Sequence, residues 1–249
     1  MAAAPRISLV VPVYEEEGNL EPLIGEIREA MEAVAEPWEL LLVDDGSRDR
    51  SWEIIAREAA ADPRVRGLRF RHNAGQTAAF VAGFHAARGE LLVTLDADRQ
   101  NDPADIPRLL EIQAREEADA VLGIRRHRHD SLLRRWASRI ANAWRRWRTR
   151  DDTVDTGCSL KVFRRVFLVD LPRFHGMHRY LPTLARLAGA ERIVQVPVNH
   201  RPRVAGESKY GIWDRLWVGI ADVRAVRWMQ KRAIRYEVAE ELPPAGGDA

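Results

Sequence analysis

The sequence is poor in cysteine and has no long apolar run. Cys158 is its single cysteine, so no disulfide can form within the chain, which fits a reducing compartment. We expect Cys158 to be a small buried side chain. The N-terminus lacks the apolar core of a secretory signal, and no apolar segment approaches about eighteen residues, so we expect no membrane-spanning helix.

The chain also lacks an excess of charge of one sign. Its 39 Lys and Arg residues nearly balance 37 Asp and Glu residues, giving a net charge of +2 over 249 residues. No global field therefore argues for a nucleic-acid partner. Hydrophobic residues make up 46% of the chain, enough for the core of one large α/β domain.

Short β-branched runs alternate with helical patterns along the chain. This alternation predicts βαβ units and an α/β fold with a mostly parallel sheet flanked by helices. The expected strands are 7–13, 39–43, 65–70, 90–95, 120–124 and 193–198, and the expected helices are 19–34, 50–60, 77–87 and 103–117. We assign the domain to residues 1–210, a C-terminal amphipathic, interfacial helix to 211–235, and a disordered tail to 236–249.

Acidic residues follow three of the predicted strands. Glu16, Asp45 and the pair Asp96 and Asp98 lie where strands end, and right-handed crossovers bring such ends to one edge of a parallel sheet. Two carboxylates two residues apart can bind one divalent cation and leave its other positions to phosphate oxygens. Alternatively, they cap the helix that starts near Pro103, although position 102 is the better cap.

Five motifs together resemble the family 2 glycosyltransferases, over roughly residues 6 to 215. They are Pro12-x-Tyr14-x-Glu16, Asp44-Asp45-Gly46-Ser47, Asn73-Ala74-Gly75-Gln76, Asp96-Ala97-Asp98-Arg99-Gln100-Asn101 and Arg203-Val204-Ala205-Gly206-Glu207-Ser208-Lys209. The set is similar to members that load a sugar onto a polyprenyl phosphate, such as dolichol-phosphate mannosyltransferase and the undecaprenyl-phosphate aminoarabinose transferases. The resemblance implies a GT-A (Rossmann-like) fold, a UDP- or GDP-sugar donor, and Mg²⁺ or Mn²⁺.

The resemblance also implies roles for the donor-side residues. Asp98 would be the direct metal ligand, with Asp96 orienting the metal or ribose and Gln100 beside the ion. A departing diphosphate develops negative charge, which a divalent ion stabilises. The residues expected to contact the donor are Pro12, Tyr14, Glu16, Asp45, Asp96, Arg203 and Lys209. Asp44 is either the structural partner of Asp45 or shares its role.

Cationic residues are expected to handle the phosphates. Arg203 and Lys209 lie in a Gly- and Ser-containing segment, which is either a lid over the diphosphate or an ordinary surface loop. Arg125 and Arg126 follow a strand where the family places arginines near the acceptor phosphate. Asp155 either orients the acceptor, as a third catalytic candidate beside the metal-site aspartates, or is structural.

A basic segment occupies residues 123–150, with ten arginines and a single acid. As a helix, it places Trp136, Trp144 and Trp147 on roughly one third of the circumference and arginines, Arg145 among them, on the rest. This is typical of a helix at an anionic membrane surface. The alternative is a helix that packs its tryptophans on the protein core. Nucleic acid is disfavoured by the acids at the sheet edge.

The sequence thus predicts a metal-dependent, inverting glycosyltransferase bound peripherally to the inner face of the cytoplasmic membrane. It would move a sugar from a nucleotide sugar to a polyprenyl phosphate. One alternative is transfer to a hydroxyl of a glycolipid or polysaccharide, which would need a base such as Asp155. Another is a non-catalytic nucleotide-sugar-binding or membrane-docking protein.

Overall fold

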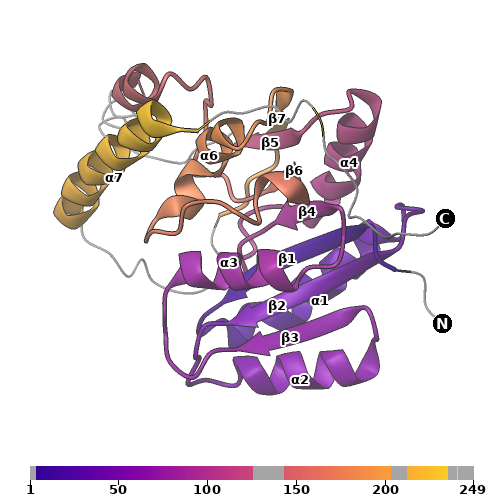
Figure 1. The fold of residues 1–249 in the computed structure, drawn as a ribbon. Coiled ribbons are helices and arrows are strands. Elements are labelled where there is room, and N and C mark those ends of the chain that lie inside the picture. Colours follow the sequence, from indigo (N-terminus) through magenta and orange to yellow (C-terminus); the bar gives the residue numbers. More distant parts are fainter. Residues whose placement is uncertain (1–3, 126–142, 203–211, 235–239, 241–249) are drawn as a thin grey trace, which may run out of the picture.

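The computed structural model describes residues 4–125, 143–202, 212–234 and 240, and within these residues a seven-stranded sheet forms the centre (Figure 1). The strand order is β3-β2-β1-β4-β6-β5-β7. All neighbours pair in parallel except β6, which is antiparallel to both β4 and β5. The strands are β1 (Ile7–Val13), β2 (Trp38–Asp44), β3 (Val65–Arg69), β4 (Leu91–Thr94), β5 (Ala120–Arg125), β6 (Lys161–Arg164) and β7 (Ile193–Val198).

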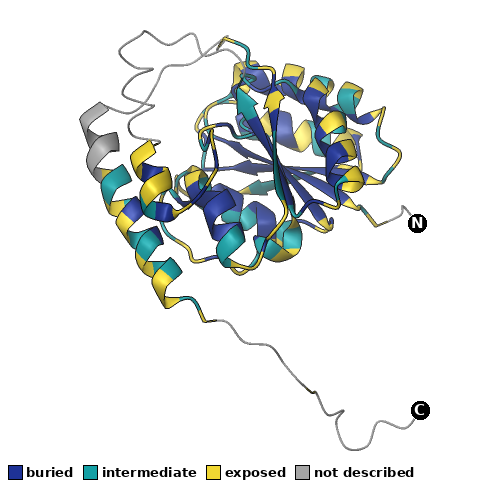
Figure 2. Cartoon of the chain, turned by 90° about the horizontal axis from the view of Figure 1, so that it is seen from above, coloured by how far each residue is buried: buried dark blue, intermediate teal, exposed yellow. Residues whose placement is uncertain are grey.

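Helices cover both faces of the sheet, and this confirms the predicted α/β class (Figures 1 and 2). The helices are α1 (Glu17–Met31), α2 (Ser51–Ala61), α3 (Gln76–Ala86), α4 (Ile106–Arg115), α6 (Leu181–Leu187) and α7 (Ile212–Arg232), with 3-10 turns η1 (Pro103–Asp105), η2 (Arg165–Phe167) and η3 (Met177–Tyr180). Residues 143–149 form a further helical segment. Asp102 caps η1, accepting a hydrogen bond from the Ala104 main-chain N at 3.1 Å, as the proline that follows it predicts.

Alternation along the strands divides the core into two layers. On β1, Leu9 and Val11 face a layer shared with α1, α2 and α4. Val10 faces the opposite layer, shared with α3, η3, α6 and α7. At Gly83 of α3, a Cβ atom would come within 2.3 Å of Val10 Cγ1, so this glycine lets α3 lie directly on the sheet.

The later part of the chain differs more from expectation. Strand β6 and helix α6 were not predicted, and β6 makes the sheet mixed at this point. Helix α7 is present where a C-terminal helix was expected, and it buries Val223 and Val226 in the core layer that contains Leu184. Among the described residues, no helix is long and apolar enough to cross a membrane. The tail predicted for 236–249 lies outside the described residues except for position 240.

Candidate active site

Five parallel strands, β1, β2, β4, β5 and β7, end at one edge of the sheet and carry the candidate residues there. The loops after β1 and β2 are joined by a hydrogen bond from the Asp45 main-chain N to the Val13 carbonyl at 2.8 Å. After β7, the Arg201 main-chain N donates to the Gln100 carbonyl at 2.7 Å, so this strand end meets the loop after β4. The prediction that these strands end at one edge of the sheet is therefore confirmed.

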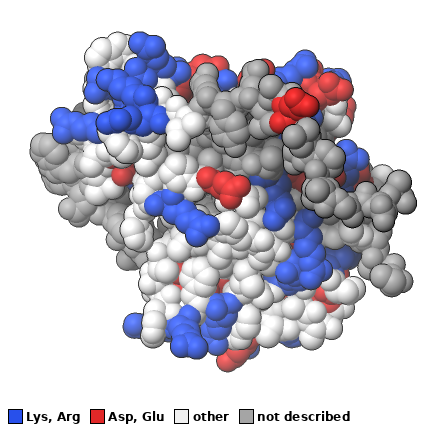
Figure 3. Space-filling view, viewed as in Figure 1, with Lys and Arg blue, Asp and Glu red and all other residues white. Residues whose placement is uncertain are grey.

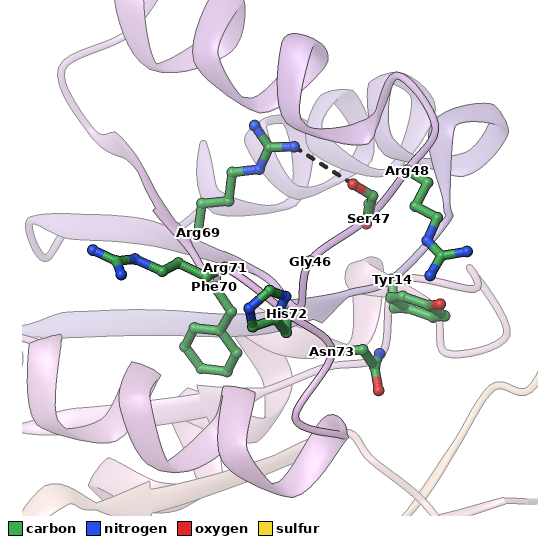
Figure 4. A pocket seen from close by; sticks show the side chains of 9 residues that line it. All are labelled: Tyr14, Gly46, Ser47, Arg48, Arg69, Phe70, Arg71, His72 and Asn73. Atoms are coloured by element: carbon green, nitrogen blue, oxygen red, sulfur yellow. Dashed lines mark hydrogen bonds between the residues drawn. The ribbon is translucent and has the colours of Figure 1, made fainter.

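A cavity of about 480 Å³ lies beyond the ends of β1, β2 and β3 (Figure 4). Tyr14, which was predicted to contact the donor base, lines this cavity, and its ring stands opposite the 70–73 segment. The other lining residues are Gly46, Ser47, Arg48, Arg69, Phe70, Arg71, His72 and Asn73. Pro12 is buried within β1 and does not line the cavity. Aromatic rings and cations around an open hollow suit a planar base carrying an anionic phosphate.

Asp45 is turned toward the turn that begins α3. Its carboxylate accepts hydrogen bonds from the Asn73 side-chain amide at 3.0 Å, the Ala74 main-chain N at 2.7 Å and the Gly75 main-chain N at 2.8 Å. Burial raises the pKa of Asp45, opposed by the two main-chain donors. Asp45 therefore supports the 73–75 turn, and its predicted contact with the donor stays a prediction.

The neighbours of Asp45 fix the same loop. Gly46 has a φ of 74°, and a Cβ there would lie 2.8 Å from the Asn73 main-chain N, so the two loops touch only because this position is glycine. Asp44 is fully buried, accepts from the Ser47 main-chain N at 3.1 Å and pairs with Arg69 at 3.2 Å. Both aspartates of the Asp44-Asp45 motif thus hold loops together. The sequence alone had left open whether Asp44 supports Asp45 or shares its role.

Glu16 lies at the start of α1, outside the lining of this cavity. Its carboxylate accepts a hydrogen bond from the Asn19 side-chain amide at 2.6 Å, and its main-chain N donates to Ser51 Oγ at 3.0 Å. These contacts bind the loop after β1 to the first turns of α1 and α2. The predicted contact of Glu16 with the donor base stays a prediction.

A second cavity of about 480 Å³ opens beside the end of β4, lined by Asp96, Asp98 and Gln100. Asp96 accepts a hydrogen bond from the Gln76 side-chain amide at 2.7 Å, and Asp98 accepts one from the Gln100 main-chain N at 3.1 Å. Arg99, between them, has a φ of 59°, a strained conformation for a residue with a side chain. The three predicted metal-site residues are thus brought to one cavity.

Electrostatics at this cavity favour a cation. Burial, and then the nearby charge of Asp98, raise the pKa of Asp96 to about 6. A divalent ion would offset that repulsion, and carboxylate oxygens are the ligands that Mg²⁺ and Mn²⁺ prefer. The described residues hold no group of three or more His, Cys, Asp or Glu side chains that could bind a metal. The pair therefore fits an ion whose remaining ligands come from Gln100, substrate phosphates and water.

Asp155 and Arg125 form a closed pair next to this cavity. Arg125 Nε and Nη2 donate to the two Asp155 carboxylate oxygens, each at 2.8 Å, and Asp155 is 4% exposed. Asp155 also accepts from the Gly157 main-chain N at 3.2 Å. The bidentate pair fixes the orientation of the Arg125 guanidinium. The predicted roles of Arg125 and Asp155 toward the acceptor stay predictions.

Sequence reasoning missed many residues of the second cavity, four polar ones among them. Ser159 Oγ accepts from the Asp96 main-chain N at 3.1 Å and from the Asn101 side-chain amide at 2.7 Å, so it ties β6 to the loop after β4. His178 lies 2.7 Å from Thr77 Oγ1, and burial lowers its pKa to about 3, which keeps it neutral. The other two of these four are Gln76 and Lys161. Gln76 belongs to the motif Asn73-Ala74-Gly75-Gln76, which could have identified it. No motif or periodic pattern around the other three residues indicated a role.

The basic segment requires a correction. Arg145 was placed on the exposed arginine face, but it is 6% exposed and pairs with Asp151 at 2.9 Å. It also donates to the Thr153 carbonyl at 2.6 Å, and Thr183 donates to Asp151. Trp147, by contrast, is 71% exposed, so it does not pack on the core. The helical projection was wrong for Arg145 because it could not register a carboxylate supplied by the following loop.

Several predicted residues lie outside the described part of the chain. These are Arg126, Arg203, Lys209 and most of the basic segment, including Trp136. The expectations for the lid and for the second acceptor arginine stay predictions.

Comparison with known proteins places this geometry in a class. The fold resembles glucosyl-3-phosphoglycerate synthase from Mycobacterium tuberculosis, in complex with Mn²⁺, UDP and glucosyl-3-phosphoglycerate, with a TM-score of 0.66, 22% identity and coverage of 93% of this chain and 81% of that one. The same enzyme with phosphoglyceric acid gives a TM-score of 0.65, 21% identity and the same coverage. The sheet and its helices are therefore a GT-A fold, the architecture of glycosyltransferases.

The family follows from sequence. Residues 8–168 match the Glycosyl transferase family 2, and the chain belongs to that family. It is 40% identical over 211 residues to the undecaprenyl-phosphate 4-deoxy-4-formamido-L-arabinose transferases of Salmonella choleraesuis and Salmonella newport. Each match covers 84% of this chain and 64% of the relative, so the chain spans less than two thirds of the length of these relatives. The motifs in the sequence thus predicted the correct family.

Proposed function

We propose that the protein transfers a sugar from a UDP- or GDP-sugar to a polyprenyl phosphate at a membrane surface, with inversion at the anomeric carbon. The observation that carries the proposal is the pair Asp96 and Asp98, both lining a cavity at the strand edge next to the Tyr14 cavity. The 40% identity to transferases named for undecaprenyl phosphate supports the acceptor.

Asp98, Asp96 and Gln100 would hold Mg²⁺ or Mn²⁺ in this scheme. When bound, the ion would neutralise charge on the departing diphosphate. Tyr14 would flank the base in the first cavity, while the Asp45-bound turn would hold the loops that shape it. Arg203 and Lys209 would close over the diphosphate and keep out water that would otherwise hydrolyse the donor.

The acceptor chemistry needs no strong base. The second pKa of a phosphate monoester is about 6, so near neutral pH the acceptor is already an anionic nucleophile. Arg125, held by Asp155, and Arg126 would attract that anion. Engagement of Asp155 by Arg125 disfavours the alternative in which Asp155 takes a proton from a hydroxyl acceptor.

Exposed tryptophans and arginines support attachment to a membrane. Helix 143–149 and α7 lie side by side, joined by a hydrogen bond from the Gln230 side-chain amide to the Thr149 carbonyl at 2.7 Å (Figures 1 and 2). Trp147 is 71% and Trp228 61% exposed. We name as the Trp–Arg surface the exposed residues Trp144, Arg146, Trp147, Arg150, Arg224, Trp228, Lys231 and Arg232.

The Trp–Arg surface carries no exposed acid among residues 143–150 and 218–232. Figure 3 shows Lys and Arg side chains gathered at the upper left, over this part of the molecule. Amphipathic rings suit the headgroup region, and each cation near an anionic leaflet contributes on the order of 1 kcal/mol. The inner face of the cytoplasmic membrane, where nucleotide sugars would be available, is the proposed location.

A panel of substrates tests the proposal. The purified protein would be incubated with Mn²⁺, one nucleotide sugar at a time, and undecaprenyl phosphate in anionic vesicles, and sugar-lipid product would be measured. We expect product with at least one UDP- or GDP-sugar and none without a divalent cation. Product only when a hydroxyl acceptor replaces the phosphate would favour the glycolipid alternative. Donor binding with no product from any acceptor would favour a non-catalytic protein.

A further inference from the structure

Lys161 is a fully buried cation at the floor of the second cavity. It lies on β6 and is 2% exposed, yet it lines the same cavity as Asp96 and Asp98. In the sheet it stands opposite Thr94 on β4 and Leu122 on β5, so strands on both sides fix its position. Thr94 also lines the cavity, because cross-strand partners point to the same face.

The ammonium of Lys161 has fewer partners than donors. It carries three N–H groups and donates one hydrogen bond, to the Cys158 carbonyl, within the part of the chain that the structure describes. That acceptor is neutral. Burying an ammonium whose charge is not matched by a hydrogen-bonded anion is costly, so burial lowers the pKa of Lys161. An anion bound beside Lys161 would favour its charged form.

The neighbouring carboxylates do not form hydrogen bonds with the Lys161 ammonium. Asp155 is bound on both oxygens by Arg125, and Asp96 accepts a hydrogen bond from Gln76. Both carboxylates attract Lys161 at longer range, but neither is hydrogen-bonded to it. Arg125, the cation predicted from sequence, is by comparison already paired with a carboxylate.

We propose that Lys161 binds a phosphate oxygen of a substrate in the second cavity. This inference rests on the proposed function and adds to it a phosphate-binding residue that no motif identified. A phosphate oxygen supplies the negative charge that the buried ammonium lacks, which a sugar hydroxyl does not. The oxygen belongs either to the donor diphosphate, next to Asp96 and Asp98, or to the acceptor phosphate.

Thermal unfolding of Lys161→Met separates a binding role from a structural one. If the charge is kept for a ligand, replacing it by an apolar side chain of similar length should leave the melting temperature equal to or above that of the wild type. A melting temperature many degrees lower, or failure to fold, would place the ammonium among the structural contacts and overturn the proposal. Lys161→Arg, which keeps the charge, tests binding independently of that outcome.

Calorimetric titration with two probes distinguishes the two phosphates. UDP or GDP with Mn²⁺, whichever the wild type binds more tightly, reports on the donor side, and a short isoprenyl phosphate in detergent reports on the acceptor side. We expect Lys161→Met to weaken one of them about tenfold or more, the loss expected for a charge-assisted hydrogen bond, and to leave the other within about twofold. Lys161→Arg should bind the weakened probe more tightly than Lys161→Met does. Arg57→Met, at an exposed ion pair with Glu21, is the matched control and should change neither.

The outcomes keep this inference apart from the proposed function. Unchanged binding of both probes in Lys161→Met, or no binding of either probe to the wild type, would overturn the role of Lys161. If the wild type binds phosphate through Lys161 but forms no sugar-lipid product from any donor, the transfer reaction fails while the binding residue stands.

Discussion

The two sides of the sheet edge place charge in opposite ways. On the side of β1, β2 and β4, the buried Asp45 is held by main-chain N–H groups, and the half-buried Asp96 is held by an amide side chain. On the side of β5, β6 and helix 143–149, the buried groups include the cations Lys161 and Arg145. The first arrangement suits a cation. On the second side Arg145 is already paired with Asp151, so of these two cations it is Lys161 that suits an anion. A transferase that joins a metal-bound diphosphate to an anionic acceptor needs both.

The largest expected effect tests the acidic side. Asp98→Asn should reduce sugar transfer by about 10³-fold or more, because the metal loses its charged ligand and the leaving diphosphate loses its counter-charge. Initial rates at saturating donor measure the effect. Asp170→Asn, at an exposed acid remote from the strand edge, is the matched control and should retain the wild-type rate. A rate for Asp98→Asn equal to that of the control would remove Asp98 from the metal site.

The next effect tests the buried cation that the sequence misplaced. Arg145→Ala should lower the free energy of unfolding by about 3–5 kcal/mol, because Asp151 is left buried without its ion-pair partner. Urea unfolding followed by tryptophan fluorescence gives the value. Arg146→Ala, one residue along the same helix and exposed, should change it by less than about 0.5 kcal/mol. Equal losses in the two variants would show that burial does not distinguish these arginines.

A smaller effect concerns the Trp–Arg surface. The pair Trp147→Ala and Trp228→Ala should lower partitioning onto vesicles of anionic lipid by about 10–100-fold, since two large rings no longer enter the headgroup region. Sedimentation with vesicles measures it, and stability should stay near the wild-type value because both rings are exposed. The pair Trp38→Phe and Trp52→Phe, within the domain body, provides the control. If the alanine pair partitions as the wild type does, the Trp–Arg surface does not contact the membrane.

The smallest effect concerns an acid far from the edge. Hydrogen bonds from Arg64, and then from Arg28, lower the pKa of Asp62 to about 2. Because its folded pKa lies below the ordinary value, Asp62 stabilises the fold above about pH 4, and this contribution of about 2 kcal/mol disappears as the pH falls toward 2. Asp62→Asn should therefore flatten acid unfolding in that window. A variant that unfolds with the wild-type pH dependence would contradict the assignment.

The acidic side could be predicted from sequence because its information is local. Each strand carries its own acids at its end, so the apolar run Leu91–Thr94 and the nearby Asp96 and Asp98 together indicated a strand that ends in a site. The rules of parallel topology then predicted that such strand ends share one edge of the sheet. Asp102 was recognised as a cap because the proline beside it restricts the backbone in a known way.

The cationic side could not be predicted because its partners are distant. Lys161 begins a strand of only four residues, which is too short to show a recognisable alternation. The burial of Lys161 depends on β4 and β5, on either side of β6. Arg145 appears polar and exposed in a helical projection, whereas its environment comes from Asp151 and from Thr183 on α6. Long-range electrostatic compensation leaves no periodic signal in a single sequence.

Calorimetric titration of UDP tests most directly whether the carboxylates at the end of β4 bind a diphosphate through a metal. With Mn²⁺, the wild type should bind UDP, or GDP if that is its base, at least about tenfold more tightly than with a chelator, and the double variant Asp96→Asn with Asp98→Asn should lose that difference. Equal affinity with and without Mn²⁺, or a metal dependence that survives in the double variant, would contradict the account.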